Sequence, residues 1–171
     1  MKRLKFSVEG AQLANEEWGF NCGPSAVAAM LGLYLDEIRP HLGDFELKRY
    51  TNPKLMWEIL RNLGVHYQMN TGTPGGVVWP NYGLARVQWE GPWTADGVPM
   101  AARYRHTHWV GCNGANRHDI GIWDINCLSI DNRTGWVSLA DWTSMMVPFI
   151  TSSIKRANGK WHLTHSVEIA Q

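Results

Sequence analysis

Hydrophobic positions follow a helical spacing in the first third of the chain and mostly alternate with polar positions in the rest. Residues 22 to about 34 or 35 form a run of small and apolar side chains, which predicts a buried helix. Residues 36–50 contain a proline and a glycine and predict a short helix and a loop. Apolar residues recur at helical spacing from 53 to 63, between Asn52 as N-cap and Gly64, so a second helix is predicted there.

Beyond residue 64 the alternation of apolar and polar residues predicts a β-rich half. Strands are predicted at residues 65–69, 84–89, 101–112, 120–126 and 160–169. Other predicted segments are a short opening strand at 1–10, a loop rich in glycine and proline at 71–83, a turn at 131–135, and a helical start at 139–150 that Pro148 interrupts. A helical front half followed by a β-rich back half predicts an α+β fold.

Length and composition fit one domain spanning residues 1–171. The chain is 44% hydrophobic and 18% charged, so it can bury a core. Its net charge of +1, without a long basic run, argues against nucleic acid or an anionic membrane as partner. No apolar run approaches the roughly 20 residues of a membrane span. Three cysteines (Cys22, Cys112, Cys127) and the absence of a signal-peptide pattern predict a reducing compartment, the cytoplasm.

Cys22 is the first candidate for chemistry. Gly23-Pro24 marks the turn into the predicted helix, and proline is favourable at an early helical position. The sulfur then lies at a helix N-terminus, where the helix dipole stabilises the thiolate. Taken alone, the residue fits a structural thiol at the start of a core helix equally well. A nucleophilic role needs a base nearby and a third group that orients the base.

His108 and Asp124 are candidates for that base and that orienting group. His108 precedes apolar residues in a predicted strand, and Asp124 follows 16 residues later in a strand expected to pair with it. Asn126 is expected on the same face as Asp124, where it either replaces Asp124 or holds it. Each residue alone has an ordinary structural explanation, but the order Cys, His, Asp on a helix and two adjacent strands favours a catalytic triad.

A metal site is the alternative for the same segment. His106, His108, Cys112, His118 and Asp119 lie within 14 positions, and the first two are expected to share a strand face. None of the spacings typical of zinc ligands is present. We therefore expect neither a metal nor an organic cofactor.

With these motifs in place, the chain resembles the papain-like cysteine peptidases, especially the bacterial and phage branch that includes the bacteriocin-leader-processing peptidases. The resemblance is carried by Cys22-Gly23-Pro24 at the start of a helix of small residues, by His108-Trp109-Val110, and by Asp124 on the next strand. It covers roughly residues 10–145. It implies a cysteine-bearing helix packed on an antiparallel sheet, and hydrolysis of a peptide or isopeptide bond in a protein or peptide substrate. The small size further suggests a stand-alone, phage-encoded enzyme.

One position departs from that family pattern. Such enzymes usually carry a glutamine six residues before the cysteine, which donates to the oxyanion together with the backbone N–H of the cysteine. This chain has Glu16 there, and Gln12 lies four residues too early. We expect Glu16 to point away while the indole of Trp18 or the amide of Asn15 or Asn21 supplies the second donor. The alternative is a buried, protonated Glu16 that donates its O–H.

The sequence therefore predicts a cysteine hydrolase in which Cys22 is the nucleophile, His108 the general base and later general acid, and Asp124 the group that orients His108. Attack on a carbonyl would give a thioester acyl-enzyme that water hydrolyses. Two alternatives stay open. The same thioester supports glutamine deamidation or transglutamination, and a catalytically inactive papain-like domain would serve as a binding or virion module with a tryptophan-rich cleft.

Overall fold

The computed structural model describes residues 3–72, 75–116, 118–129 and 134–170. Within these ranges the chain forms a six-stranded sheet with the strand order β1-β6-β2-β3-β4-β5, and every neighbouring pair is antiparallel. The strands are β1 (Tyr67–Thr71), β2 (Tyr82–Trp89), β3 (Thr107–Asn113), β4 (Gly121–Trp123), β5 (Trp136–Ser138) and β6 (Trp161–Ile169). The last strand, β6, lies between β1 and β2, so it is an interior strand of the sheet.

Most helices precede the sheet in the sequence, and the others connect its strands. The α-helices in the described ranges are α1 (Val8–Trp18), α2 (Cys22–Leu31), α3 (Leu35–Ile38), α4 (Phe45–Lys48), α5 (Pro53–Asn62), α6 (Met100–Arg103), α7 (Leu139–Asp141) and α8 (Val147–Ser152). Short 3₁₀ turns occur at Arg39–His41, Pro92–Thr94 and Ile125–Cys127, and a π-helical segment, Trp142–Met146, joins α7 to α8.

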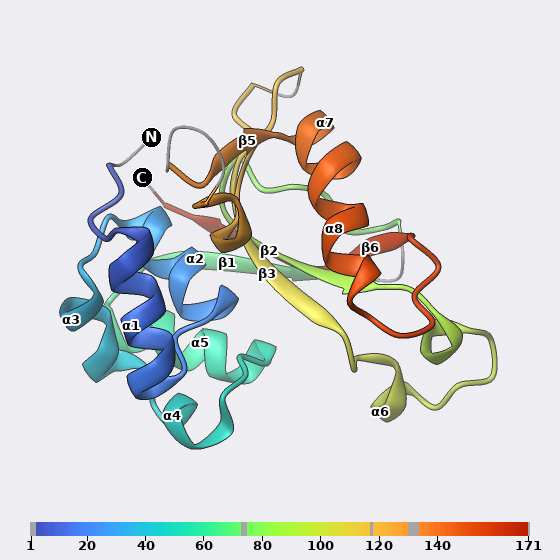
Figure 1. Ribbon diagram of the computed structural model, residues 1–171, viewed down its shortest axis with the longest axis horizontal. Coiled ribbons are helices and arrows are strands. Elements are labelled where there is room, and N and C mark those ends of the chain that lie inside the picture. Colours follow the sequence, from blue (N-terminus) through green and yellow to red (C-terminus); the bar gives the residue numbers. More distant parts are fainter. Residues whose placement is uncertain (1–2, 73–74, 117, 130–133, 171) are drawn as a thin grey trace.

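Helices cover both faces of the sheet (Figure 1). On one face α1, α2 and α5 enclose a core that includes Leu84, Trp109 and Val167 of the sheet. On the other face the π-helical segment and α8 enclose a second core, in which Trp142 lies with Val110 of β3. Because consecutive residues of a strand point to opposite faces, β3 contributes Trp109 to one core and Val110 to the other.

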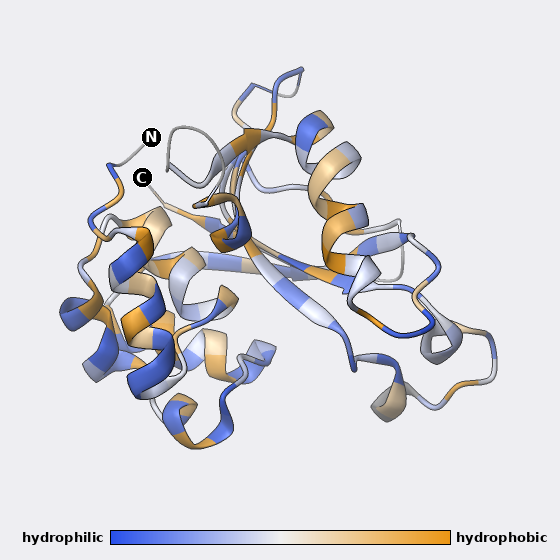
Figure 2. Cartoon of the chain, in the orientation of Figure 1, coloured by the Kyte–Doolittle hydropathy of each residue, from blue (hydrophilic) through white to orange (hydrophobic). Residues whose placement is uncertain are grey.

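The helices differ in how far they are buried. On α1 the residues Ala11, Ala14 and Trp18 are buried, and Figure 2 shows hydrophobic and hydrophilic residues alternating along this helix. On α2 every residue from 23 to 30 is buried, because the helix lies in the middle of its layer against β3. The small side chains of α2 allow this close packing, and they place its N-terminus deep in the molecule.

The α+β class with an antiparallel sheet is confirmed, and so are the helices predicted at 22 and 53 and the strand predicted at 160–169. The predicted strands at 65–69 and 84–89 correspond to β1 and β2 with shifted ends. The first helix is shorter than predicted, because Gly32 adopts a left-handed conformation with φ of 66° and ends α2 at Leu31.

Four predictions of secondary structure were wrong in detail. Residues 3–7 form no strand, since Ser7 caps α1 instead. Residues 101–106 belong to α6 and a loop, so β3 begins only at Thr107. The strand predicted at 120–126 ends at Trp123. Pro148 does not interrupt a helix, because it lies in the first turn of α8, where no backbone N–H is needed.

The turn predicted at 131–135 lies largely outside the described residues. In the described ranges, no helix combines the length and the apolar character needed to cross a membrane.

Candidate active site

Cys22 is the first residue of α2, and contacts on two sides fix its position. Asn21 caps the helix: its Oδ1 accepts a hydrogen bond from the Gly23 N–H at 3.3 Å, and its Nδ2 donates to the Arg49 carbonyl at 2.9 Å. Gly23 allows the Thr51 segment to approach, because a Cβ at this position would collide with the Thr51 side chain. The half-buried sulfur is thus held at a helix N-terminus, as the sequence predicted.

His108 lies near the start of β3 and connects Cys22 with Asp124. Its Nε2 is 2.9 Å from Oδ2 of Asp124, and on its other side its charge and hydrogen bonding lower the pKa of Cys22. His108 is 7% exposed and Asp124 is completely buried, so their pairing takes place away from bulk water. Because Nε2 faces Asp124, Nδ1 is the nitrogen that faces the sulfur.

The carboxylate of Asp124 is fully surrounded by hydrogen-bond donors. Its Oδ1 accepts from the backbone N–H and from Nδ2 of Asn126, both at 2.9 Å. Its Oδ2 accepts from Nε1 of Trp142 at 2.8 Å and faces His108. Asp124 caps the 3₁₀ turn that follows β4, and Asn126 lies within this turn instead of on a strand, which lets Asn126 hold Asp124. Of the two roles left open for Asn126, the geometry therefore fits the holding role.

Trp142 is the contact that sequence reasoning missed. It lies 18 residues after Asp124, in the segment predicted to be a broken helix, and nothing local distinguishes it among the ten tryptophans of the chain. Its ring stacks on Trp89 at a centroid distance of 5.8 Å, and Trp89 in turn lies 6.0 Å from the His108 ring. These indoles shield the His108–Asp124 pair on the face of the sheet opposite α2.

The electrostatics of Cys22 and His108 favour a thiolate beside an imidazolium. Burial raises the pKa of Cys22, but the charge of His108 and hydrogen bonds from His108 and from the Trp109 backbone outweigh it and lower that pKa. Burial lowers the pKa of His108, but the charges of Asp124 and Cys22 and hydrogen bonds to both raise it well above the usual value. Asp124 shows the same balance: burial opposes ionisation, while His108, Trp142 and Asn126 hold its pKa low.

The two other thiols have opposite properties. Burial, with a smaller contribution from Glu168, raises the pKa of Cys112 to about 12. Burial and the charge of Asp124 raise the pKa of Cys127 to about 12 as well. Both residues are buried, whereas Cys22 is half-buried. Cys22 is therefore the thiol with the environment of a nucleophile, and the other two have that of inert core residues.

Two clefts meet at Cys22. The first cleft has a volume of about 820 Å³ and is lined by α1 residues that include Gln12 and Glu16, by Cys22 and His108, and by Asn126. The second cleft has a volume of about 680 Å³ and lies on the other side of Cys22. A chain passing over the sulfur therefore has space on both sides, as cleavage within an extended substrate requires.

Two of the residues expected near the oxyanion, Glu16 and Trp18, lie in different environments. Glu16 is exposed in the first cleft, which does not support the alternative that buries it. Trp18 is 3% exposed and packs against Phe20 and Phe45 at centroid distances of 5.1 and 6.4 Å. It lines neither cleft, so its placement does not support an oxyanion role for the indole.

Four amides line the first cleft; Asn126 donates to Asp124, and the other three are Gln12, Asn15 and Asn21. Asn15 already donates to the Phe20 carbonyl at 2.8 Å, and Asn21 donates to Arg49. Gln12 lies four residues earlier in the sequence than the oxyanion glutamine of the family pattern. It lies one helical turn before Glu16 on α1, so both side chains face the same cleft, and the helical period was the signal that identifies it.

The metal-binding alternative finds no support among the residues that the structure describes. No group of three or more His, Cys, Asp or Glu side chains there is arranged to hold a metal ion. His106 precedes β3 and packs on Trp93 at a centroid distance of 4.5 Å, so it does not share a strand face with His108.

No protein-family model matches the chain, and no curated protein matches it significantly. The chemistry of the site is therefore inferred from its own geometry: a thiol of lowered pKa, an imidazole of raised pKa and a buried carboxylate are in contact at the meeting point of two clefts. Such an arrangement can attack a carbonyl and protonate a leaving group.

Proposed function

We propose that the protein is a papain-like cysteine hydrolase that cleaves a peptide or isopeptide bond of a protein or peptide substrate. The observation that carries the proposal is the buried set of contacts from Cys22 through His108 to Asp124. The resemblance in sequence supports it, because the helix-borne cysteine and the strand-borne histidine face each other in the order and setting that the family pattern implies.

The first half of the reaction forms the acyl-enzyme. The Cys22 thiolate attacks the carbonyl carbon, a C–S bond forms, and the carbonyl electron pair moves to oxygen. The backbone N–H of Cys22 and one of the amides in the first cleft stabilise that oxyanion. The His108 imidazolium then gives its proton to the leaving amine, the C–N bond breaks, and a thioester remains.

The second half releases the product. Neutral His108 takes a proton from water, the resulting hydroxide adds to the thioester carbon, and the C–S bond breaks to return the thiolate. Asp124 stays ionised throughout, because His108, Trp142 and Asn126 all favour its charged form. Its role is to orient the imidazole and to stabilise the imidazolium in both halves.

A substrate-profiling assay tests this function. We expect the protein to cleave members of a diverse peptide library and Cys22→Ala to cleave none. Cys112→Ser is the matched control, because it removes a thiol that lies outside both clefts while keeping a donor for the Pro80 carbonyl. A mass gain of about one unit at a glutamine, without chain cleavage, would show that the protein deamidates glutamine side chains and does not cleave peptides. Failure of Cys22 to react with substrates or thiol reagents would indicate a binding module.

A further inference from the structure

Arg86, on β2, belongs to a row of three side chains that crosses the sheet. It is paired with Trp109 of β3 on one side and with His165 of β6 on the other. Residues directly opposite each other in antiparallel strands point to the same face, which here is the face of Trp109 and the helical core. All three residues line the second cleft together with Cys22. The row therefore forms one wall of the substrate site.

The Arg86 side chain is buried and incompletely paired. It is 5% exposed, Nη2 donates to Oγ1 of Thr107 at 3.1 Å, and the guanidinium lies 5.4 Å from the centroid of the Tyr104 ring. Its Nε has no hydrogen-bond partner. Among the described residues no Asp or Glu forms an ion pair with it. The charge of Cys22 favours the cation, but no carboxylate serves as its counter-ion, so a carboxylate from outside the chain would stabilise it.

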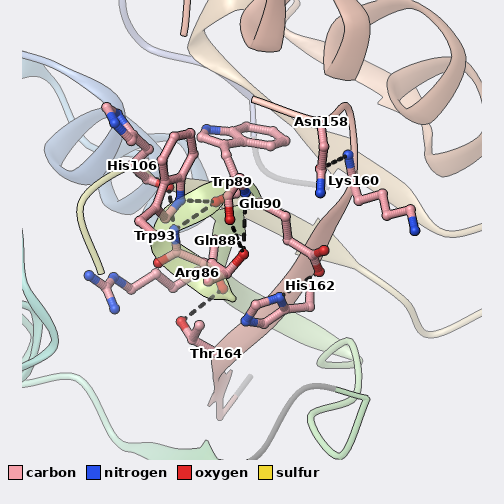
Figure 3. A network of polar contacts seen from close by, with 12 residues as sticks. Arg86, Gln88, Trp89, Glu90, Trp93, His106, Asn158, Lys160, His162 and Thr164 are labelled. Atoms are coloured by element: carbon pink, nitrogen blue, oxygen red, sulfur yellow. Dashed lines mark hydrogen bonds and ion pairs between the residues drawn. The ribbon is translucent and has the colours of Figure 1, made fainter. Parts of the chain in front are cut away.

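Nearby polar groups do not supply that counter-ion, because they are engaged with one another. Glu90 pairs with His162 at 2.9 Å, and Nε2 of Gln88 donates to the Trp89 carbonyl at 2.8 Å. In Figure 3 the Arg86 guanidinium extends away from Glu90 and His162. Arg86 joins this network only through its backbone carbonyl, which accepts a hydrogen bond from Thr164 at 3.3 Å.

The second cleft as a whole carries positive charge. Arg49 and Arg105 line it with Arg86, and no acidic residue is among its described lining residues. Burial lowers the pKa of Arg86 to about 10, which leaves the guanidinium charged near neutral pH. Burial and the neighbouring Arg86 lower the pKa of His165 to about 4, so this imidazole is neutral there. The first cleft, by contrast, is lined by the acidic residue Glu16.

We propose that the second cleft binds an acidic side chain of the substrate, whose carboxylate accepts hydrogen bonds from the Arg86 guanidinium, and that Arg86 thereby determines specificity. The inference rests on the proposed function, since it names the substrate class of the same site. Glutamate or aspartate near the cleaved bond supplies the carboxylate, and a free C-terminal carboxylate is the other chemical source. A charge-assisted hydrogen bond of this kind changes affinity roughly 10- to 100-fold.

Paired peptides test the inference during turnover. Each pair of quenched fluorescent peptides differs only in Glu or Gln at one position, and the position is moved along both sides of the cleaved bond. We expect kcat/KM to favour Glu by roughly 10- to 100-fold at one position, mainly through KM. Arg86→Gln should abolish the preference, and Arg86→Lys should restore part of it. An unchanged preference in Arg86→Gln, or none in the wild type, overturns the inference.

Two controls separate this effect from general loss of charge and identify the source of the carboxylate. Arg61→Gln removes the same charge from an exposed position on α5 outside both clefts and should keep the Glu preference. Peptides ending in a free carboxylate or in an amide distinguish the second source. A preference for the free terminus alone would overturn the assignment to an acidic side chain.

A binding measurement keeps the inference independent of catalysis. The Cys22→Ala protein is titrated into fluorescent versions of the same Glu and Gln peptides, and anisotropy reports the dissociation constants. We expect the Glu peptide to bind more tightly, with the difference lost when Arg86→Gln is added. Preferential binding without cleavage by the wild type would refute the proposed function and support this inference. Cleavage of both peptides, with equal binding and equal turnover, would support the proposed function and refute this inference.

Discussion

Two buried charged centres flank the sulfur of Cys22, and they differ in whether the chain supplies their partners. Asp124 is surrounded by donors from His108, Asn126 and Trp142, so its charge is satisfied within the chain. Arg86 is 5% exposed but keeps an unpartnered Nε and has no carboxylate among the described residues. Both centres interact electrostatically with Cys22: the charge of Asp124 raises the pKa of Cys22, and the charge of Cys22 raises the pKa of Arg86.

The difference separates two uses of a buried charge. A carboxylate with all its partners in place is rigid and can orient a catalytic imidazole. A guanidinium that lacks a partner costs stability in the free protein, and that cost is recovered when a ligand brings the missing charge. Under our proposals the Asp124 centre belongs to the catalytic machinery and the Arg86 centre to substrate recognition.

Removing members of the Asp124 centre should have the largest effect. His108→Ala and Asp124→Ala are each expected to lower kcat by roughly 10²- to 10⁴-fold, because general acid–base transfer and its orientation are lost. Initial rates with a cleaved peptide measure this, and His66→Ala, at an exposed position, is the control. If Asn126→Ala proves far more damaging than Asp124→Ala, the third member of the triad has been misassigned.

The three thiols should differ in reactivity as their pKa values differ. Because the pKa of Cys22 is lowered, its thiolate persists as the pH falls below the usual range, whereas Cys112 and Cys127, with pKa values of about 12, stay protonated. At about pH 6, iodoacetamide should modify Cys22 at least roughly 100-fold faster than either, by peptide mass mapping.

The variant Asp124→Asn extends that test. It removes the charge that raises the pKa of His108, so the pH midpoint at which the His108 imidazolium loses its proton should move downward, as NMR titration of the ring would report. Equal modification of the three cysteines, or an unmoved midpoint in this variant, would contradict the ion-pair description of the site.

Trp142→Phe should lower the stability of the protein, because it weakens the Asp124 centre. It deletes the indole donor to Asp124 while keeping an aromatic ring, so the buried carboxylate loses one charge-assisted hydrogen bond. We expect the free energy of unfolding to fall by about 1.5–3 kcal/mol in urea denaturation at pH 7. Trp57→Phe, at a position 43% exposed, is the matched control and should change little. Equal losses of stability in the two variants would mean that the hydrogen bond from Trp142 to Asp124 contributes nothing to the free energy of unfolding.

Arg86→Met should shift stability in the opposite direction. Replacing an incompletely paired buried cation by an apolar side chain of similar length is expected to raise the free energy of unfolding by roughly 1–2 kcal/mol. The same variant should lose the preference for glutamate. A destabilisation as large as that of Trp142→Phe would show that Arg86 is satisfied within the chain, and the contrast between the two centres would disappear.

The smallest effect is expected at Glu16. Its side chain is exposed in the first cleft, so Glu16→Gln should change kcat/KM by no more than about twofold, as is usual for exposed positions. Measuring the pH profile of both proteins checks this. A large loss in Glu16→Gln would reveal a role that depends on the carboxylate charge.

Local sequence patterns were sufficient for the elements that carry Cys22 and His108. Small apolar residues after Cys22 produce a helix buried all round, and the apolar residues after His108 belong to a strand with two buried faces. These signals lie within one element each. Boundaries were less predictable, because the end of α2 depends on the conformation of Gly32 and the end of β4 on the turn that Asp124 begins.

The partners of the buried charges depend on contacts between distant segments, which no local pattern contains. Trp142 reaches Asp124 only because the π-helical segment covers the sheet, and Arg86 faces the second cleft only because β6 and β3 pair on either side of β2. Residue type and position within an element therefore indicate which groups can react, because these features set the chemistry of a side chain. Which buried charges are satisfied follows only from the folded chain, because it depends on the strand order and on the helices that pack across the sheet.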